Sequence, residues 1–142
     1  MNRSPSYHVP VRLYALITWT TLRRLPLIHR DAAVFLKRAL PSIAERHGAR
    51  VVEIGVVSNH VHLVVELPLR PDIPRLLQGL KGASARVANR DGVMPRAPLR
   101  WADGYDLRSL GVRELKRAIA YVRAQDQRHP ELAIRDDVGH AG

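Results

Sequence analysis

The pattern of apolar and polar residues is clearest over residues 51–67, in the segment VVEIGVVSNHVHLVVEL. It reads as two short apolar strands joined at Ser58–Asn59, which predicts a β-hairpin. Side chains of a strand alternate between its two faces. In the second strand one face is wholly apolar and suits a core, with Val61, Leu63, Val65 and Leu67. The opposite face carries His60, His62, Val64 and Glu66. The two histidines therefore point the same way, within reach of one metal ion or one phosphate.

The remaining elements follow from patterns of the same kind. A run of β-branched and aromatic residues over 11–20 predicts the first strand. A short fourth strand is expected within 100–110, after a turn at Asp103–Gly104. Apolar residues at helical spacing predict three helices, over 31–47, 72–89 and 112–128. Pro41 is expected to bend or interrupt the first of these helices.

The predicted order is β-α-β-β-α-β-α, in one α+β domain over residues 11–128. Residues 1–10 are expected to form a flexible polar arm and residues 129–142 a tail. Four strands with two crossover helices are most simply arranged as a ferredoxin-like antiparallel sheet with helices on one face. The last helix is then an addition to that fold. Strand three is central in this topology, which places the two histidines in the middle of the open face.

Composition narrows the possible partners and metal ligands. The 142 residues carry 23 lysines and arginines against 13 acidic residues, and the formal charge of +10 favours a polyanionic partner, most simply nucleic acid. Aromatic residues make up only 5%, so an extended surface for stacking bases is not expected. Without cysteine, a metal would be held by histidine, carboxylate or amide oxygen. No signal peptide or membrane-spanning run is evident, and we expect a cytoplasmic protein.

The last predicted helix carries a tyrosine away from its packing side. Successive residues of a helix are about 100° apart, which groups the apolar side chains of Leu115, Ala118, Ile119 and Val122. Tyr121 lies well round from that group, with Gln125 as its neighbour one turn later. On an arginine-rich helix this tyrosine is a candidate nucleophile toward phosphate. Taken alone, the pattern is more typical of an amphipathic surface tyrosine, and an HxH pair alone is more often solvated.

Several motifs together resemble those of a known family. In chain order they are SNHVHLVV at 58–65, LKG at 80–82, WADGYDLRSLG at 101–111 and YVRAQ at 121–125. The combination resembles the small single-domain HUH tyrosine transposases of the IS-two-hundred/IS-six-oh-five type and their REP-associated relatives, over residues 14–125. The resemblance implies a DNA transposase. Family members bind single-stranded DNA at hairpins, at element ends or REP-like palindromes, and cut and rejoin it.

The resemblance also implies roles for individual residues. His60 and His62 match the metal-binding pair, Gln125 matches the glutamine that completes the metal site, and Tyr121 matches the nucleophile. The metal would be Mg²⁺ or Mn²⁺, although the donor set leaves zinc open. It would polarise the scissile phosphate while Tyr121 attacks, leaving a 3′-hydroxyl and a 5′-phosphotyrosine. Family members are homodimers in which the tyrosine helix of one subunit can complete the histidine pair of the other.

DNA contacts are expected from basic residues spread along the chain. They are Arg23, Arg24, Lys81, Arg86, Arg108, Arg117 and Arg128. Arg117 and Arg128 flank the tyrosine and are placed to stabilise phosphate charge. A protein of this kind is expected to associate with the nucleoid.

Two other functions are compatible with parts of the pattern. Histidine-triad nucleotide hydrolases need a third histidine two positions after His62, where this chain has Val64. A domesticated, non-catalytic protein that binds nucleic-acid hairpins on the same fold needs no active site. The complete set of His60, His62, Tyr121 and Gln125 favours the enzyme over this second alternative.

Overall fold

The computed structural model of the protein describes residues 11–125 and 133–134. The predicted arm over residues 1–10 lies outside the described residues, as do Arg128 and the predicted tail apart from residues 133–134. Within the described part of the chain, no helix is both long enough and apolar enough to cross a membrane.

Strands and helices follow one another in the predicted order. They are β1 (Leu13–Thr20), the short 3₁₀ helix η2 (Leu22–Arg24), α1 (Arg30–Arg46), β2 (Arg50–Val57), β3 (His60–Leu67), α2 (Ile73–Arg90), β4 (Asp106–Leu110) and α3 (Val112–Arg123). The sheet is antiparallel throughout, with the strand order β2-β3-β1-β4. The predicted ferredoxin-like α+β fold and the central place of β3 are therefore confirmed.

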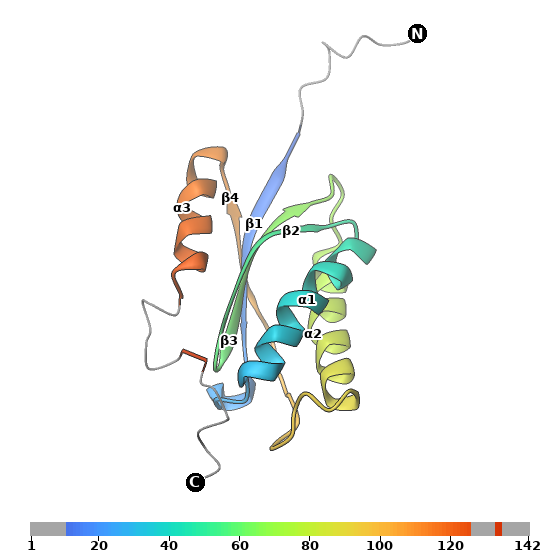
Figure 1. The fold of residues 1–142 in the computed structure, drawn as a ribbon. Helices are drawn as coiled ribbons and strands as arrows, with labels where there is room; N and C mark the ends of the chain where they lie inside the picture. The colour runs from blue at the N-terminus through green and yellow to red at the C-terminus, as the bar shows by residue number, and fades with distance from the viewer. Residues whose placement is uncertain (1–10, 126–132, 135–142) are drawn as a thin grey trace.

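Different helices cover the two faces of the sheet (Figure 1). α1 and α2 lie together on one face, and α3 lies by itself on the other. Alternate residues of β1 and β3 point into the main core beneath α1 and α2, namely Ala15, Ile17, Trp19, Val61, Leu63 and Val65. Burial of each large aliphatic side chain there stabilises the folded protein by roughly 1.5–3 kcal/mol. This is the apolar face that the alternation predicts for β3, so the histidine face is turned toward α3.

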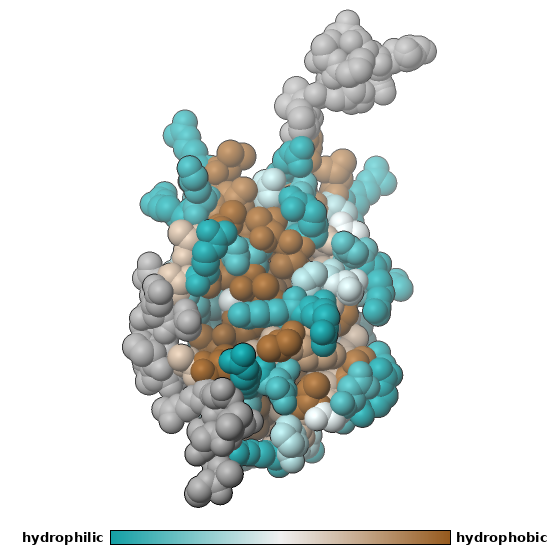
Figure 2. Space-filling model, viewed as in Figure 1, coloured by the Kyte–Doolittle hydropathy of each residue, from teal (hydrophilic) through white to brown (hydrophobic). Residues whose placement is uncertain are grey.

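A smaller apolar cluster holds α3 on the open face. Val64 of β3 is fully buried against Ala118 and Val122 of α3. Partly buried side chains pack around these three, namely Leu16, Val52, Leu110, Leu115, Ile119 and Tyr121. Figure 2 shows hydrophobic side chains gathered between the helices in this view, with hydrophilic ones projecting around them. α3 is therefore fixed to the domain by apolar contacts with strands on the open face.

The first helix is not interrupted where the prediction allowed it. α1 continues through Pro41. Proline lacks the amide hydrogen of one helical bond, but buried residues on both sides of it anchor this helix in the main core. α3 spans Val112–Arg123, and positions 126–128 of the predicted helix lie outside the described residues. Its cap residue Ala124 departs from helical geometry, with φ −96° and ψ 16°, and Gln125 turns toward the sheet.

Candidate active site

His62 lies in the sheet between Thr18 of β1 and Gly55 of β2. The Thr18 hydroxyl oxygen is 2.7 Å from His62 Nδ1, and this contact fixes the orientation of the ring. The His62 side chain is buried, and its ring stands at 90° to that of His60, with centroids 4.7 Å apart. Both histidines lie on the open face, as the alternation predicts.

His60 is oriented by the residue before it. The side-chain nitrogen of Asn59 donates toward the carbonyl oxygen of Arg24 over 3.4 Å. This leaves Asn59 Oδ1 to accept from His60 Nδ1 at 2.7 Å. A neutral imidazole carries one N–H and one lone pair. With the proton on Nδ1, the lone pair is on His60 Nε2, which faces Gln125. Asn59 thereby orients the His60 ring in the way that a hydrogen-bonded partner orients a metal-ligating histidine.

α3 comes close to the sheet because β2 has a glycine where the helix passes. A Cβ atom on Gly55 would lie only 2.6 Å from the backbone carbonyl oxygen of Val122, which is too close to pack. Arg123 Nη2 donates to Glu53 Oε1 over 2.9 Å and ties the end of α3 to the same strand. Sequence reasoning missed both β2 residues. The available signal was a glycine inside a run of β-branched residues.

Gln125 reaches His60 from the end of α3. It is only 2% exposed, and its Nε2 lies 3.4 Å from His60 Nε2. Its Oε1 is buried and has no hydrogen-bond partner within the described residues. A buried acceptor without a hydrogen-bond partner destabilises the folded protein by about 1–3 kcal/mol. A half-turn of the amide exchanges its oxygen and nitrogen, which would turn Oε1 toward the lone pair of His60.

The donor set of this site fits a divalent cation. No three His, Cys, Asp or Glu side chains come together in the described part of the chain. The Gln125 amide, which lies beside His60, is a candidate third donor next to the two imidazoles. Imidazole nitrogen and amide oxygen both serve first-row divalent ions such as Mn²⁺. Mg²⁺ prefers oxygen ligands, so we expect it to bind this set more weakly. A cation would also satisfy the orphaned Oε1 atom.

Tyr121 is half-buried beside His62, with ring centroids 5.6 Å apart and an interplanar angle of 79°. The helical pattern predicts that this ring lies away from the packing side, but it contacts the cluster around Val64. The reason is that α3 lies over the open face, where the sheet reaches both sides of the helix. Next to the ring is a cleft of about 480 Å³, whose lining includes Tyr121, His62, Arg108 and Arg117. A candidate nucleophile, a candidate metal ligand and two arginines thus border one cleft.

Comparison with known proteins decides the family. The family model described as IS200-like transposase matches residues 10–125. The chain belongs to the IS200-like transposase family. The ISDra2 transposase TnpA of Deinococcus radiodurans is 37% identical to it over 73 residues, which are 51% of each protein. The chain thus spans about half the length of this curated relative.

Two solved structures resemble this IS200-like transposase. One is a crystal structure of a candidate transposase from Deinococcus radiodurans, with 26% identity and a TM-score of 0.63 over 95% of this chain and 100% of the other. The second is a REP-associated tyrosine transposase bound to a REP hairpin. It is 13% identical, with a TM-score of 0.63 over 91% of this chain and 74% of the other, and so shows the fold alone.

In this IS200-like transposase, Arg23 and Arg24 form an exposed turn joined to the residue before His60. Both have left-handed backbone, with φ of 55° and 56°, which costs about 1–2 kcal/mol for each non-glycine residue. The Arg24 amide donates to the Thr21 carbonyl, and the Arg24 carbonyl faces the Asn59 amide. Two of the predicted DNA-contacting residues are therefore fixed close to the histidine pair.

The two predicted DNA contacts on α2 lie away from the tyrosine. The Lys81 ammonium donates to the carbonyl oxygens of Ala102 over 2.7 Å and Gly104 over 2.8 Å, and so holds the loop before β4. Burial lowers the pKa of Lys81, against a smaller opposite effect of Asp103. Arg86 lines a groove between α1 and α2, beyond the main core. The DNA contacts of these residues stay predictions.

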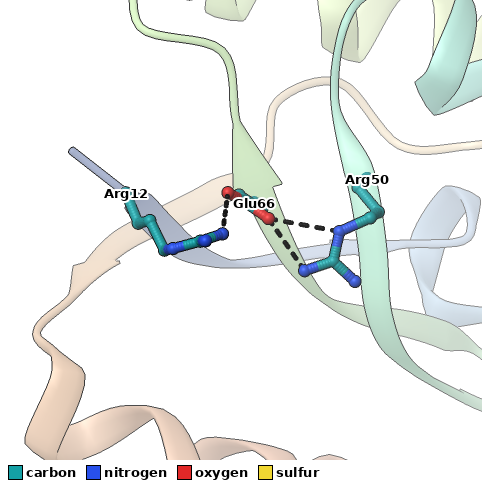
Figure 3. Close-up of polar contacts among 3 residues, drawn as sticks. All are labelled: Arg12, Arg50 and Glu66. Atoms are coloured by element: carbon teal, nitrogen blue, oxygen red, sulfur yellow. Dashed lines mark hydrogen bonds and ion pairs between the residues drawn. The ribbon is translucent and has the colours of Figure 1, made fainter. Parts of the chain in front are cut away.

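Glu66 shares the histidine face but lies at the other end of β3. Its carboxylate accepts from Arg50 over 2.8 Å and from Arg12 over 3.2 Å, so it links β3 to the first residue of β2 and to the residue before β1 (Figure 3). The hydrogen bond from Arg50 is the main cause that lowers the pKa of Glu66 below its usual 4.5.

Proposed function

We propose that the protein cleaves and rejoins single-stranded DNA at hairpin-containing ends, through a covalent bond between Tyr121 and a 5′-phosphate. The observation that carries this proposal is the buried Gln125 Oε1, which has no hydrogen-bond partner among the described residues and lies beside His60 just after the tyrosine helix. It is explained if these residues, with His62, hold a cation next to the nucleophile. Membership of the IS200-like transposase family supports the same activity.

The covalent step takes place in the cleft beside His62. The phenol oxygen of Tyr121 attacks phosphorus in line, and the bond from phosphorus to the 3′ oxygen of the preceding nucleotide breaks. The phenol loses its proton, and the departing oxygen gains one and becomes a 3′-hydroxyl. The downstream strand stays joined to the protein through its 5′-phosphate. A 3′-hydroxyl that later attacks this phosphotyrosine rejoins the strands without ATP.

Arg108 and Arg117 are placed to bind the phosphate in this step. Arg108 lies on β4 and Arg117 on α3, and both line the cleft with Tyr121. Guanidinium groups bind phosphate oxygens through paired, charge-assisted hydrogen bonds. Arg108 is 3.6 Å from the Asp106 carboxylate in an exposed pair. Exposed ion pairs contribute only about 0–1 kcal/mol to the stability of the folded protein. Arg108 can therefore exchange Asp106 for a phosphate group.

A divalent cation, Mg²⁺ or Mn²⁺, would be held by ring nitrogens of His60 and His62 and by the amide oxygen of Gln125. When bound, such an ion polarises the phosphate and stabilises the charge that develops on its oxygens. The chain itself keeps these donors in place, since Thr18 and Asn59 orient the two imidazole rings.

The proposed substrate is DNA that carries a hairpin next to the cut strand. The solved relative bound to a REP hairpin supports this choice. We also propose a homodimer, which the family resemblance implies. In this structure α3 lies over the histidines of its own chain, with Gln125 beside His60, so sharing of sites between subunits would require the helix to exchange.

The test uses single-stranded DNA that carries a hairpin and a label at its 3′ end. With Mn²⁺ or Mg²⁺, we expect a labelled protein band that survives denaturation, whereas a 5′ label should be released on a fragment with a 3′-hydroxyl. Tyr121→Phe removes only the phenol oxygen and should abolish the band. Tyr105→Phe is the matched control, because this tyrosine is exposed before β4, and it should retain the band.

A band that persists in Tyr121→Phe would overturn the assignment of the nucleophile. His60→Ala and His62→Ala should lose the band and still bind the hairpin. Hairpin binding by the unmodified protein with no covalent band in either metal would instead favour the non-catalytic hairpin-binding alternative.

A further inference from the structure

Thr21 lies between β1 and the turn that carries Arg23 and Arg24, at the end of the sheet where β3 begins (Figure 1). It is a polar residue, yet it is fully buried. We propose that Thr21 is a positioning residue of the DNA-cutting reaction, which locks the arginine turn onto the β2–β3 turn beside His60. This inference rests on the proposed function and names the residue that aligns the bound strand with the proposed metal ligands.

The Thr21 hydroxyl joins two segments of the chain. It donates to the carbonyl oxygen of Leu25 over 2.6 Å and lies 3.2 Å from the carbonyl oxygen of Asn59. A hydroxyl carries a single proton, and the shorter distance assigns this proton to the bond with Leu25. The Thr21 amide donates to the Asn59 carbonyl over 2.9 Å. Because Leu25 closes the arginine turn and Asn59 orients His60, one buried residue connects the turn to the histidine.

The arginine turn needs this connection because its backbone is strained. Arg23 and Arg24 have φ of 55° and 56°, which is uncommon for residues that carry a side chain. Such a conformation persists only where the surrounding structure holds it, and it is concentrated at functional sites. The Arg24 amide donates to the Thr21 carbonyl, and the hydroxyl bond to Leu25 closes the same turn. Without the hydroxyl, we expect the turn to relax toward right-handed backbone.

Thr21 is itself held from its other side by the segment before β4. It forms an isolated β-bridge with Trp101, and a backbone hydrogen bond lies on each side of this pair. The Trp101 indole donates to the Ser84 hydroxyl of α2 over 3.1 Å, and the Lys81 ammonium holds the carbonyl oxygen of Ala102. The arginine turn therefore takes its position from a helix of the main core, through Thr21.

The position of this turn matters because one side chain separates it from the histidine pair. The Arg24 carbonyl and the His60 ring contact opposite ends of the Asn59 side-chain amide. Both arginines of the turn are exposed, and guanidinium groups bind phosphate oxygens. A phosphate held there belongs to the same strand as the scissile one, so it sets the alignment of the scissile phosphate with Tyr121. Loss of the Thr21 hydroxyl should therefore slow the covalent step more than it weakens DNA binding.

The test compares three variants. Thr21→Val keeps the shape of the side chain and removes the hydroxyl, whereas Thr21→Ser keeps the hydroxyl and removes a methyl group. Ile43→Val is the control for stability, because it removes one methylene group from the main core near the C-terminal end of α1. Its cost in stability is similar to that of one lost hydrogen bond. The substrate is the 3′-labelled single-stranded DNA with a hairpin, and Mn²⁺ is the metal.

Single-turnover kinetics with saturating DNA gives the rate of the covalent step, and fluorescence anisotropy without metal gives the Kd of the same DNA. For Thr21→Val we expect a rate lower by about 10–100-fold, the effect of a small misplacement of reacting groups, with a Kd within about threefold of the unmodified protein. Thr21→Ser and Ile43→Val should match the unmodified protein in both quantities. In NMR spectra, the strong intraresidue amide-to-Hα contact that marks a positive φ at Arg23 and Arg24 should persist in Thr21→Ser and weaken in Thr21→Val.

Several results would overturn the role of Thr21 while the covalent band of the unmodified protein keeps the proposed function intact. They are a normal rate in Thr21→Val, an equal slowing in Ile43→Val, an unchanged NMR contact at the two arginines, or a large rise in Kd at an unchanged rate. If the unmodified protein forms no covalent band, the proposed function fails and the role of Thr21 fails with it. If Thr21→Val does not fold, Thr21→Ala carries the same comparison with Thr21→Ser.

Discussion

At the scale of single residues, Asn59 decides which nitrogen of His60 faces Gln125. Asn59→Leu keeps the size of the side chain and removes the acceptor for the N–H at His60 Nδ1. Loss of the partner of a metal-ligating histidine typically lowers metal affinity about 10–100-fold, and we expect a fall of this size for Mn²⁺. Calorimetric titration measures the affinity, and nitrogen NMR of the imidazole rings in the metal-free protein reports which atom carries the proton.

Asn59→Asp is the control for this change, because it keeps an acceptor oxygen at the same place and should retain Mn²⁺ binding. Both variants lose the side-chain bond to the Arg24 carbonyl and keep the backbone carbonyl that accepts from the Thr21 amide, so they differ from each other in the acceptor beside His60. If Asn59→Leu changed the proton position without changing the Mn²⁺ affinity, His60 would not be a ligand. If neither changed, Asn59 would not orient the ring.

At the scale of secondary-structure elements, the position of α3 depends on a missing side chain in β2. In Gly55→Ala the new Cβ meets the backbone of Val122, which cannot move unless the helix moves. Overpacking of this kind typically costs about 1–3 kcal/mol, and we expect the free energy of unfolding to fall by that amount. Because Tyr121 moves with the helix, the covalent band should be strongly reduced. Urea unfolding and the labelled-DNA assay measure the two effects.

Gly82→Ala is the matched control for this substitution, since within the described residues no atom beyond its chain neighbours and its own helix backbone lies within 4 Å of the added Cβ. Alanine is favoured over glycine in a helix by up to about 1 kcal/mol, so this variant should be slightly more stable and as active as the unmodified protein. Normal activity in Gly55→Ala would contradict the idea that close contact between α3 and β2 positions the nucleophile.

The far end of the sheet is held by charges whose effect depends on pH. Arg50 and Arg12 lower the pKa of Glu66 in the folded protein below its usual 4.5. The stabilisation is therefore present above that usual value and is lost as the pH falls through the lowered pKa. Urea unfolding between about pH 6 and pH 2 should show a smaller acid dependence in Glu66→Gln than in the unmodified protein. A difference between the two proteins that is equal at every pH would contradict this linkage.

At the scale of the whole molecule, the local pattern of the chain predicts the sheet but not where the last helix lies on it. Alternation in β3 is a property of neighbouring residues, and it correctly places His60 and His62 on the open face. The position of α3 depends on pairs such as Glu53 and Arg123, which are 70 residues apart. Helical spacing places Tyr121 on one side of α3, but it does not say how much of the helix the sheet covers.

The basic residues show the same limit. Motif comparison predicts that Lys81 contacts DNA, yet its ammonium binds the carbonyl of Ala102, which lies 21 residues later in the chain. Conversely, Arg38 and Arg46 belong to none of the motifs. They line one groove with Arg86 only because α1 and α2 pack side by side. Composition predicts an anionic partner, but the tertiary structure decides which cations are available to it.

The position of α3 over its own sheet predicts that one chain holds a complete site. The ion pair of Arg123 with Glu53 fixes this helix in place. We therefore expect that a mixture of Tyr121→Phe and His60→Ala proteins forms no covalent band with labelled hairpin DNA, because each chain lacks one part of its own site. Co-expression with two different tags and purification on both ensures that mixed dimers are the species measured.

A dimer with shared sites behaves differently in the same measurement. The Tyr121→Phe chain would then supply intact histidines to the intact tyrosine of its partner, and each mixed dimer would contain one working site. A recovered band would therefore show that α3 exchanges between subunits. In that case Glu53→Gln, which removes the ion pair with Arg123, should increase the recovery, because the helix is then held less firmly on its own sheet. A recovery that Glu53→Gln leaves unchanged would mean that this ion pair does not control the exchange.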